Sequence, residues 1–210
     1  MTSRPVVGVD FDNTIADFDD VIHAVALESQ FIGSRVPKSK RRIRDWIRQR
    51  QDGEDRWRAV QAAVYGPRIE GARLAPGVDR FLRQCRERGV TVYVISHKTE
   101  FATADRTGTN LRDAARGWLE RSGLFDAHGG GLAPGQVFFE STRDDKLRRI
   151  ARMGCTHFID DLEETFLEPA FPAGVEKILY DPHIECDTRA AARVFTNWAA
   201  IGEYAFNGGR

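Results

Sequence analysis

Five short apolar segments recur along the chain, and longer stretches with helical periodicity separate them. The apolar residues in each segment are nearly continuous rather than alternating with polar ones. A strand that is covered on both of its faces has this composition, and such strands are typical of parallel sheets. We therefore predict five buried strands, over residues 5–10, 90–96, 136–140, 156–160 and 176–180.

The stretches between these segments have the spacing of amphipathic helices. In one of them, Phe81, Leu82 and Cys85 follow one another at helical intervals, and the pattern closes on Gly89, a residue suited to a helix C-cap. Strands that alternate with helices predict an α/β fold, here a three-layer, Rossmann-like parallel sheet with right-handed crossovers. The predicted helices cover residues 77–89, 110–123, 141–154 and, as a last helix docking on the sheet, 187–206.

One interval departs from this alternation of strands and helices. About sixty residues between Thr14 and Pro76 contain no strand candidate, which is unusually long for a simple connection. Their pattern predicts two or three helices, so we divide the chain into a core of residues 1–15 and 76–210 and a helical insertion of residues 16–75. Residues 35–58 hold ten Lys/Arg and four Asp/Glu. These charges could form an anion-attracting surface, but we favour a helix whose charges cover its outer face, with Trp46 and Trp57 in the insertion's own core.

Composition excludes several classes of protein. The 210 residues carry equal numbers of basic and acidic side chains, so net charge gives no reason to expect a nucleic-acid or membrane binder. No apolar run approaches the roughly 20 residues of a membrane-spanning helix, and the N-terminus does not resemble a signal peptide. Three widely spaced cysteines, Cys85, Cys155 and Cys186, indicate neither disulfides nor a zinc site. We expect a cytoplasmic protein with reduced thiols.

Polar residues follow several of the predicted strands. Since the carboxyl ends of parallel strands meet at one edge of the sheet, where ligands bind, we expect these side chains to lie together. Carboxylates that lie so close repel one another unless a cation joins them, and Mg²⁺ prefers such oxygen ligands. The predicted cluster consists of Asp10, Asp12 and Thr14 after the first strand, Ser96 after the second, Asp160 and Asp161 after the fourth, and Lys146 near the start of the preceding helix.

These residues, in this order, resemble the four motifs of the haloacid dehalogenase (HAD) superfamily. "VGVDFDNTIA" is similar to the first motif, an apolar strand followed by DxDxT, and "VYVISH" to the second, a strand ending in Ser or Thr. Lys146 in "RDDKL" resembles the third motif, and "THFIDDLEET" the fourth, a strand ending in paired acids. Each motif is weak alone, but together they span residues 6–161 in the family's order. The final fifty residues carry no motif.

The resemblance implies a mechanism. Asp10 would attack phosphorus and form an aspartyl-phosphate, and Asp12 would act as general acid and then as general base. Mg²⁺ would be held by Asp10, by the backbone carbonyl of Asp12 and by the Asp160/Asp161 pair. Ser96 and Lys146 would bind the phosphoryl oxygens, Thr14 would position Asp12, and His97 is a further candidate for substrate contact.

The resemblance also implies an activity. Family members that cleave carbon–halogen or carbon–phosphorus bonds lack an acid at the position of Asp12, so its presence favours phosphomonoester hydrolysis or phosphoryl transfer. The insertion resembles the small helical cap of this superfamily. We therefore expect a Mg²⁺-dependent phosphatase that acts on a small phosphorylated metabolite. The sequence identifies neither the substrate nor the oligomeric state.

Other interpretations of these residues stay open. Ser96 can serve as a helix N-cap, and Lys146 stands beside arginines in a run that usually forms a solvated helix face. A phosphoryl-accepting receiver domain also combines a parallel sheet with an acidic pocket, although its phosphorylated Asp ends a middle strand and it has no such insertion. The basic segment of the insertion leaves a nucleotide or polynucleotide-end phosphatase as a further alternative, which the neutral net charge disfavours.

Overall fold

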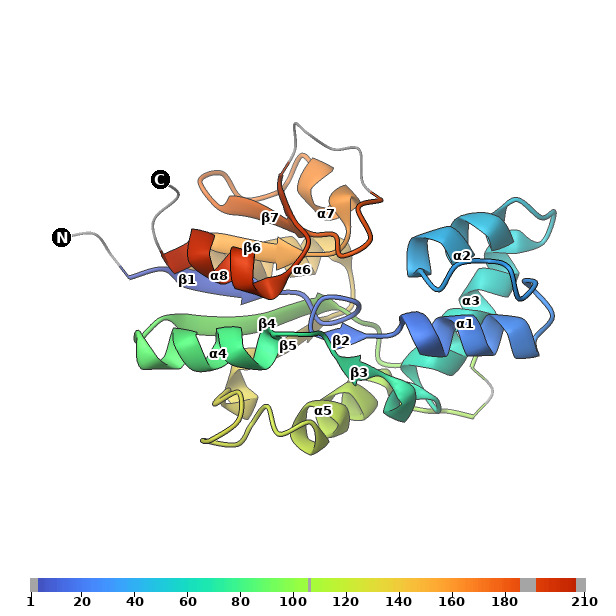
Figure 1. The fold of residues 1–210 in the computed structure, drawn as a ribbon, viewed down its shortest axis with the longest axis horizontal. Coiled ribbons are helices and arrows are strands. Elements are labelled where there is room, and N and C mark those ends of the chain that lie inside the picture. Colours follow the sequence, from blue (N-terminus) through green and yellow to red (C-terminus); the bar gives the residue numbers. More distant parts are fainter. Residues whose placement is uncertain (1–3, 106, 186–191, 207–210) are drawn as a thin grey trace.

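The computed structural model describes residues 4–105, 107–185 and 192–206, and its centre is a six-stranded parallel sheet (Figure 1). The strand order is β5-β4-β1-β6-β7-β8, and every neighbouring pair is parallel. The strands are β1 (Val6–Val9), β4 (Thr91–His97), β5 (Val137–Glu140), β6 (His157–Asp160), β7 (Glu176–Tyr180) and β8 (Arg193–Phe195). The first five confirm the five predicted strands.

The sixth strand was not predicted. Residues 193–195 fall within the range expected to be the last helix, but they pair with β7, with Val194 opposite Leu179. The helix itself is shorter than expected, α8 (Trp198–Phe206), and residues 187–191 of the predicted range lie outside the described residues. Three residues beside alanines and arginines are too few to show the periodicity of a strand. Residues 193–195 form a strand because the edge of β7 is available for pairing.

Helices cover both faces of the sheet and make three layers. Successive residues of the inner strands point to opposite faces, which explains their nearly continuous apolar composition. Ile159 and Val94, for example, belong to the apolar cluster with α4 (Val78–Glu87), α5 (Leu111–Arg121) and α8. Their neighbours Phe158 and Ile95 belong to a second cluster with α6 (Arg143–Arg152) and α7 (Glu163–Leu167). α4, α5 and α6 confirm three of the predicted helices.

The long interval after Thr14 contains three helices, α1 (Asp19–Glu28), α2 (Lys40–Arg48) and α3 (Gly53–Tyr65), and a 3₁₀ turn, η1 (Ile69–Gly71). Figure 1 shows α1–α3 grouped to one side of the sheet. Two short strands, β2 (Ala16–Asp17) and β3 (Arg73–Leu74), were not predicted. They pair antiparallel at the two ends of the segment that holds these helices. Trp57 is buried as expected, but the Trp46 side chain is not, because that residue is 44% exposed.

Among the described residues, no helix has both the length and the apolar character needed to cross a lipid bilayer.

Gly8 lets β1 and β6 pack at the centre of the sheet. A Cβ atom at this position would lie 2.5 Å from the ring of Phe158, which is fully buried, and 3.1 Å from the sulfur of Cys155. The ring is held by the second apolar cluster and has no free space to move into. Glycine inside a strand often marks such a close approach.

We expect Gly8→Ala to lower the free energy of unfolding by about 1–3 kcal/mol, because the added methyl group overpacks a rigid part of the core. Chemical denaturation monitored by circular dichroism measures this. Gly33→Ala is the matched control, since a Cβ there meets no atom within 4 Å. Equal stabilities of the two variants would contradict this account of the packing.

Candidate functional site

The turn after β1 holds Asp10 and Asp12 on either side of a buried ring. Phe11 is fully buried and packs edge-on against Phe18 and Phe139, so its two neighbours in the chain face away from the core. The backbone amides of residues 15 and 16 donate to the Phe11 carbonyl and close the turn. Asn13 takes the left-handed conformation, with φ of 60°, which asparagine tolerates better than most residues. The local sequence thus fixes both carboxylates.

Asp10, Asp160 and Asp161 form an acidic cluster. Each contributes a carboxylate oxygen, and these oxygens lie within 4.8 Å of one another. Lys146 reaches the cluster from α6, and its Nζ donates to Asp10 Oδ1 at 2.7 Å and to Asp160 Oδ2 at 2.6 Å. All three side chains of this ion-pair network are buried. One ammonium group therefore faces two carboxylates, which leaves the network negative.

Three groups in and beside the cluster have raised pKa values, namely Asp160, Asp161 and Lys146. Burial, with repulsion from Asp10, raises the pKa of Asp160 despite the nearby Lys146. Burial, with repulsion from Asp160 and Asp10, raises the pKa of Asp161 to about 7 against the opposing effect of Lys40. Burial alone would lower the pKa of Lys146, but the charges of Asp10 and Asp160 outweigh it and raise that pKa. The cluster therefore favours any additional positive charge.

Asp161 has one oxygen that the protein leaves without a partner. Its Oδ2 accepts from Lys40 Nζ at 2.7 Å, while its Oδ1 is buried and has no hydrogen-bond partner among the described residues. Such a buried carboxylate oxygen is costly unless a ligand satisfies it. Carboxylate oxygens gathered in this way suit a hard divalent cation. The residues present thus fit a metal ion of this kind.

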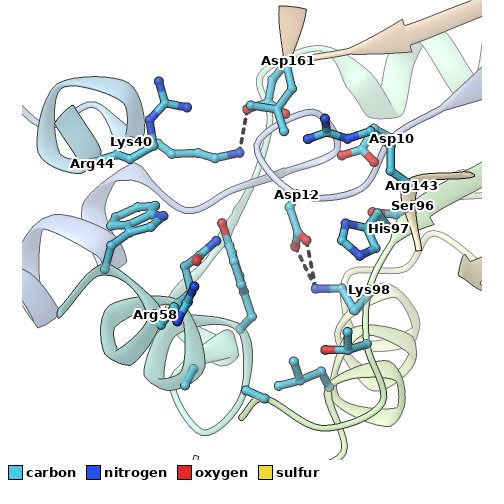
Figure 2. A pocket seen from close by; sticks show the side chains of 18 of the residues that line it. Asp10, Asp12, Lys40, Arg44, Arg58, Ser96, His97, Lys98, Arg143 and Asp161 are labelled. Atoms are coloured by element: carbon cyan, nitrogen blue, oxygen red, sulfur yellow. Dashed lines mark hydrogen bonds and ion pairs between the residues drawn. The ribbon is translucent and has the colours of Figure 1, made fainter. Parts of the chain in front are cut away.

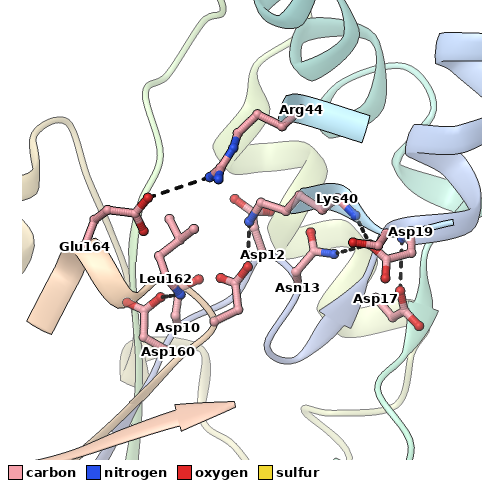
Figure 3. Close-up of polar contacts among 12 residues, drawn as sticks. Asp10, Asp12, Asn13, Asp17, Asp19, Lys40, Arg44, Asp160, Leu162 and Glu164 are labelled. Carbon is pink, nitrogen blue, oxygen red and sulfur yellow. Dashed lines mark hydrogen bonds and ion pairs between the residues drawn. The ribbon is translucent and has the colours of Figure 1, made fainter. Parts of the chain in front are cut away.

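Lys40 reaches the cluster from the insertion, and Asp19 holds the backbone at this first residue of α2. The Lys40 backbone amide donates to Asp19 Oδ1 at 2.8 Å (Figure 3). Asp19 Oδ1 also accepts from the Asn13 side chain, and its Oδ2 lies 2.6 Å from His183 Nε2. One carboxylate thus joins the turn after β1, the start of α2 and the loop after β7.

Asp12 is paired with Lys98. Lys98 Nζ lies 3.0 and 2.9 Å from the two Asp12 carboxylate oxygens, and the lysine side chain is only 2% exposed (Figure 2). The ammonium also lies over the rings of Phe11 and Tyr65. The sequence contained a signal for this contact, because Ser96 and Lys98 are two residues apart at a strand end and so share one side of the chain.

The remaining predicted residues lie nearby. Ser96 is buried at the end of β4 and, like His97, lines a cavity with Asp10 and Asp12. The His97 ring contacts the Ser141 carbonyl at 3.2 Å, and burial lowers the pKa of this histidine. Thr14 is fully buried, and its hydroxyl has no hydrogen-bond partner among the described residues. Its positioning of Asp12 stays a prediction.

The cavity has a volume of about 460 Å³, which is typical of small-molecule sites. The strand-end residues form one part of its lining, and the inner faces of α2 and α3 form another. We expected the basic residues of the insertion on its outer face, and for four of them this is wrong. The cavity-lining residues that the sequence analysis did not assign to the site include Lys40, Arg44, Arg48, Trp57, Arg58 and Tyr65 of the insertion, and Arg143 of α6.

Comparison with known proteins bears on the fold. No protein-family profile and no curated protein matches the chain. A HAD-superfamily hydrolase from Ehrlichia chaffeensis matches 99% of this chain and 98% of its own, with 14% identity and a TM-score of 0.55. A HAD family hydrolase from Deinococcus radiodurans R1, with bound phosphate and sodium, matches 98% and 96%, with 17% identity and a TM-score of 0.54.

A structure of Mycobacterium tuberculosis protein tyrosine kinase A matches 98% of this chain and 99% of its own, with 16% identity and a TM-score of 0.60. The matches to the Ehrlichia and Deinococcus structures over nearly the whole chain show that it has the fold that HAD-superfamily structures share. This confirms the fold that the sequence resemblance implied.

We expect Lys146→Met to lower the free energy of unfolding by about 3–5 kcal/mol in EDTA, because the change leaves two buried carboxylates without their ammonium partner. Urea denaturation measures the loss. Lys38→Met is the matched control, since Lys38 forms an exposed ion pair with Asp20 and its removal should cost less than about 0.5 kcal/mol. A Lys146 variant as stable as the control would show that the acidic network is not strained by charge.

Proposed function

We propose that this chain, which has the HAD fold, is a HAD-superfamily phosphatase that hydrolyses small phosphomonoesters with Mg²⁺. The observation that carries the proposal is the placement of Asp10. This buried carboxylate directly follows β1, shares the Lys146 ammonium with Asp160, and faces a cavity that Asp12, Ser96 and Asp161 also line. The proposed nucleophile, acid–base group and cation-binding cluster thus line the same cavity.

In the first step, a carboxylate oxygen of Asp10 attacks phosphorus while the bond from phosphorus to the leaving oxygen breaks. Asp12 gives its proton to that oxygen, so the product leaves as an alcohol and Asp10 carries the phosphoryl group. The Lys98 ammonium, 2.9–3.0 Å away, stabilises the Asp12 carboxylate formed in this step.

In the second step, Asp12 removes a proton from a water molecule, whose oxygen attacks phosphorus as the bond to Asp10 breaks. The products are inorganic phosphate and the original Asp10 carboxylate. Ser96 and Lys146 hold the phosphoryl oxygens through both steps, and His97 and Thr14 are further candidates for contacts near the substrate. Asp12 ends each cycle protonated, ready for the next substrate.

Mg²⁺ would be held by Asp10, Asp160 and Asp161 with the backbone carbonyl of Asp12. When bound, it supplies positive charge that lets an anionic nucleophile approach an anionic phosphate. The unpartnered Oδ1 of Asp161 supports this assignment. The phosphate in the Deinococcus structure supports a phosphoryl ligand for this fold.

Residues 16–75 are proposed as the cap of this site. The β2–β3 pair gives the insertion a narrow base, and its helices α2 and α3 line the cavity opposite the strand ends. A cap in this position excludes bulk water during the reaction.

Phosphoryl transfer to another acceptor, or a receiver-like signalling role, would use the same aspartate. One of the matching structures is a protein tyrosine kinase, so the fold alone does not choose between water and another acceptor. The insertion beside the pocket favours an enzyme over a receiver. A phosphoenzyme that persisted after treatment with an acyl phosphate would favour the receiver, whereas rapid release of phosphate would favour the hydrolase.

We expect Asp10→Asn to lower phosphate release from p-nitrophenyl phosphate by a factor on the order of 10³ or more, because the amide cannot form the phosphoenzyme. EDTA should abolish the wild-type activity and added Mg²⁺ should restore it. Asp144→Asn is the matched control, an exposed acid at the start of α6. Full activity of the Asp10 variant would exclude the covalent mechanism.

Mg²⁺ should also raise the melting temperature of the wild-type protein, because it neutralises the acidic cluster of the folded state alone. A concentration of one hundred times Kd corresponds to about 2.7 kcal/mol. Asp161→Asn should lose most of this shift, and Asp144→Asn should keep it. Differential scanning fluorimetry measures both. An undiminished shift in the Asp161 variant would place the ion elsewhere.

A further inference from the structure

The cavity holds more positive charge than the acidic cluster and a phosphoryl group require. Its lining includes seven Lys/Arg side chains and four Asp/Glu side chains. Three of the cations, Lys40, Lys98 and Lys146, are already paired with aspartates at the strand ends. Arg44, Arg48 and Arg58 of the insertion have no such role in the proposed reaction. Figure 2 shows Arg44 and Arg58 on the side of the cavity across from Ser96, His97 and Lys98.

These cations extend outward from the acidic cluster. Lys40, Arg44 and Arg48 are four residues apart on α2, so they lie along one face of that helix. Lys40 Nζ marks the inner end of the row, because it contacts Asp161. At 1.5 Å per residue, Arg44 and Arg48 follow about 6 and 12 Å further along the helix axis. Arg58 lines the same cavity from α3.

The present partners of the three arginines are exposed acids. Arg44 contacts Asp45 at 2.9 Å and Glu164 at 3.8 Å, and Arg48 contacts Glu54 at 2.8 Å. Arg58 lies 3.7 Å from Glu54 and 3.4 Å from Asp55. The acid side chains in these pairs are 49–83% exposed. Exposed pairs of this kind contribute little stability, so a bound anion can replace them at small cost.

We propose that the substrate carries a second anionic group, a phosphate or a carboxylate, and that Arg44, Arg48 and Arg58 bind it. The guanidinium groups offer paired donors that match the oxygens of either group. Trp57 and Tyr65 line the cavity from α3 and supply apolar surface for the carbon skeleton between the two anions. This inference rests on the proposed function for the reacting end of the substrate.

The first test compares substrates that differ in the second anion alone. Fructose 1,6-bisphosphate is paired with fructose 6-phosphate, and 3-phosphoglycerate with glycerol 3-phosphate. We expect the member with two anionic groups to have the higher kcat/KM by roughly 10- to 100-fold in at least one pair. A preference confined to one pair distinguishes a phosphate from a carboxylate. Equal rates in both pairs would overturn the proposal.

The second test removes the arginines. Arg48→Gln with Arg58→Gln should lower kcat/KM for the preferred doubly anionic probe roughly 10- to 100-fold and leave that for p-nitrophenyl phosphate within about twofold. Arg50→Gln is the matched control, an exposed arginine of the α2–α3 turn that does not line this cavity. Equal losses on both probes would contradict a separate anion subsite.

A binding measurement separates this inference from the proposed function. Calorimetry compares 4-phosphonobutyrate with butylphosphonate, which carries a methyl group in place of the carboxylate, on the Mg²⁺-loaded wild-type protein. If 4-phosphonobutyrate binds more tightly than butylphosphonate, and the Arg48/Arg58 variant loses this difference in affinity, the subsite is supported even if no phosphomonoester is hydrolysed. Hydrolysis of p-nitrophenyl phosphate, with no difference between the two phosphonates and equal rates within both substrate pairs, would refute the subsite and keep the phosphatase.

Discussion

Repulsion between carboxylates at the end of a parallel sheet is the constraint around which this molecule is arranged. The buried Asp10 and Asp160 and the half-buried Asp161 bring three carboxylates together at the ends of two adjacent strands. Lys146 from α6 forms ion pairs with Asp10 and Asp160, and Lys40 from the insertion forms one with Asp161. These cations come from segments far apart in the chain, so the site exists only when core and insertion are both folded. The pairing is also incomplete, which leaves room for a divalent ion.

Much of the fold and of the site could be predicted because both follow from strand topology. Parallel strands place their carboxyl ends at one edge, so Asp10, Ser96 and Asp160 had to converge once the strands were recognised. Lys146 was harder, since its position on α6 among arginines resembles an exposed helix face. The structure shows why it is buried, as α6 packs on the sheet with its first turn beside the acidic cluster.

The insertion could not be predicted in the same way. Its helices have good periodicity, but periodicity does not say which neighbour a polar face will meet. The basic row of α2 looked like an ordinary solvated surface, and it turns inward because Ile43 and Ile47 on the adjacent face are buried. Lys98 was missed as the partner of Asp12 for a related reason, since its contact depends on a turn and a strand 86 residues apart. β8 depends on an edge that exists only after β7 has folded.

Asp19 has a further consequence, because it ties the insertion to the sheet through the start of α2. The same residue of α2, Lys40, is held by Asp19 through its backbone and by Asp161 through its side chain. A swing of α2 away from the sheet would therefore take a positive charge out of the acidic cluster at the moment the pocket opened. Access to the pocket and the affinity of the cluster for cations are thermodynamically linked, and each must change whenever the other does.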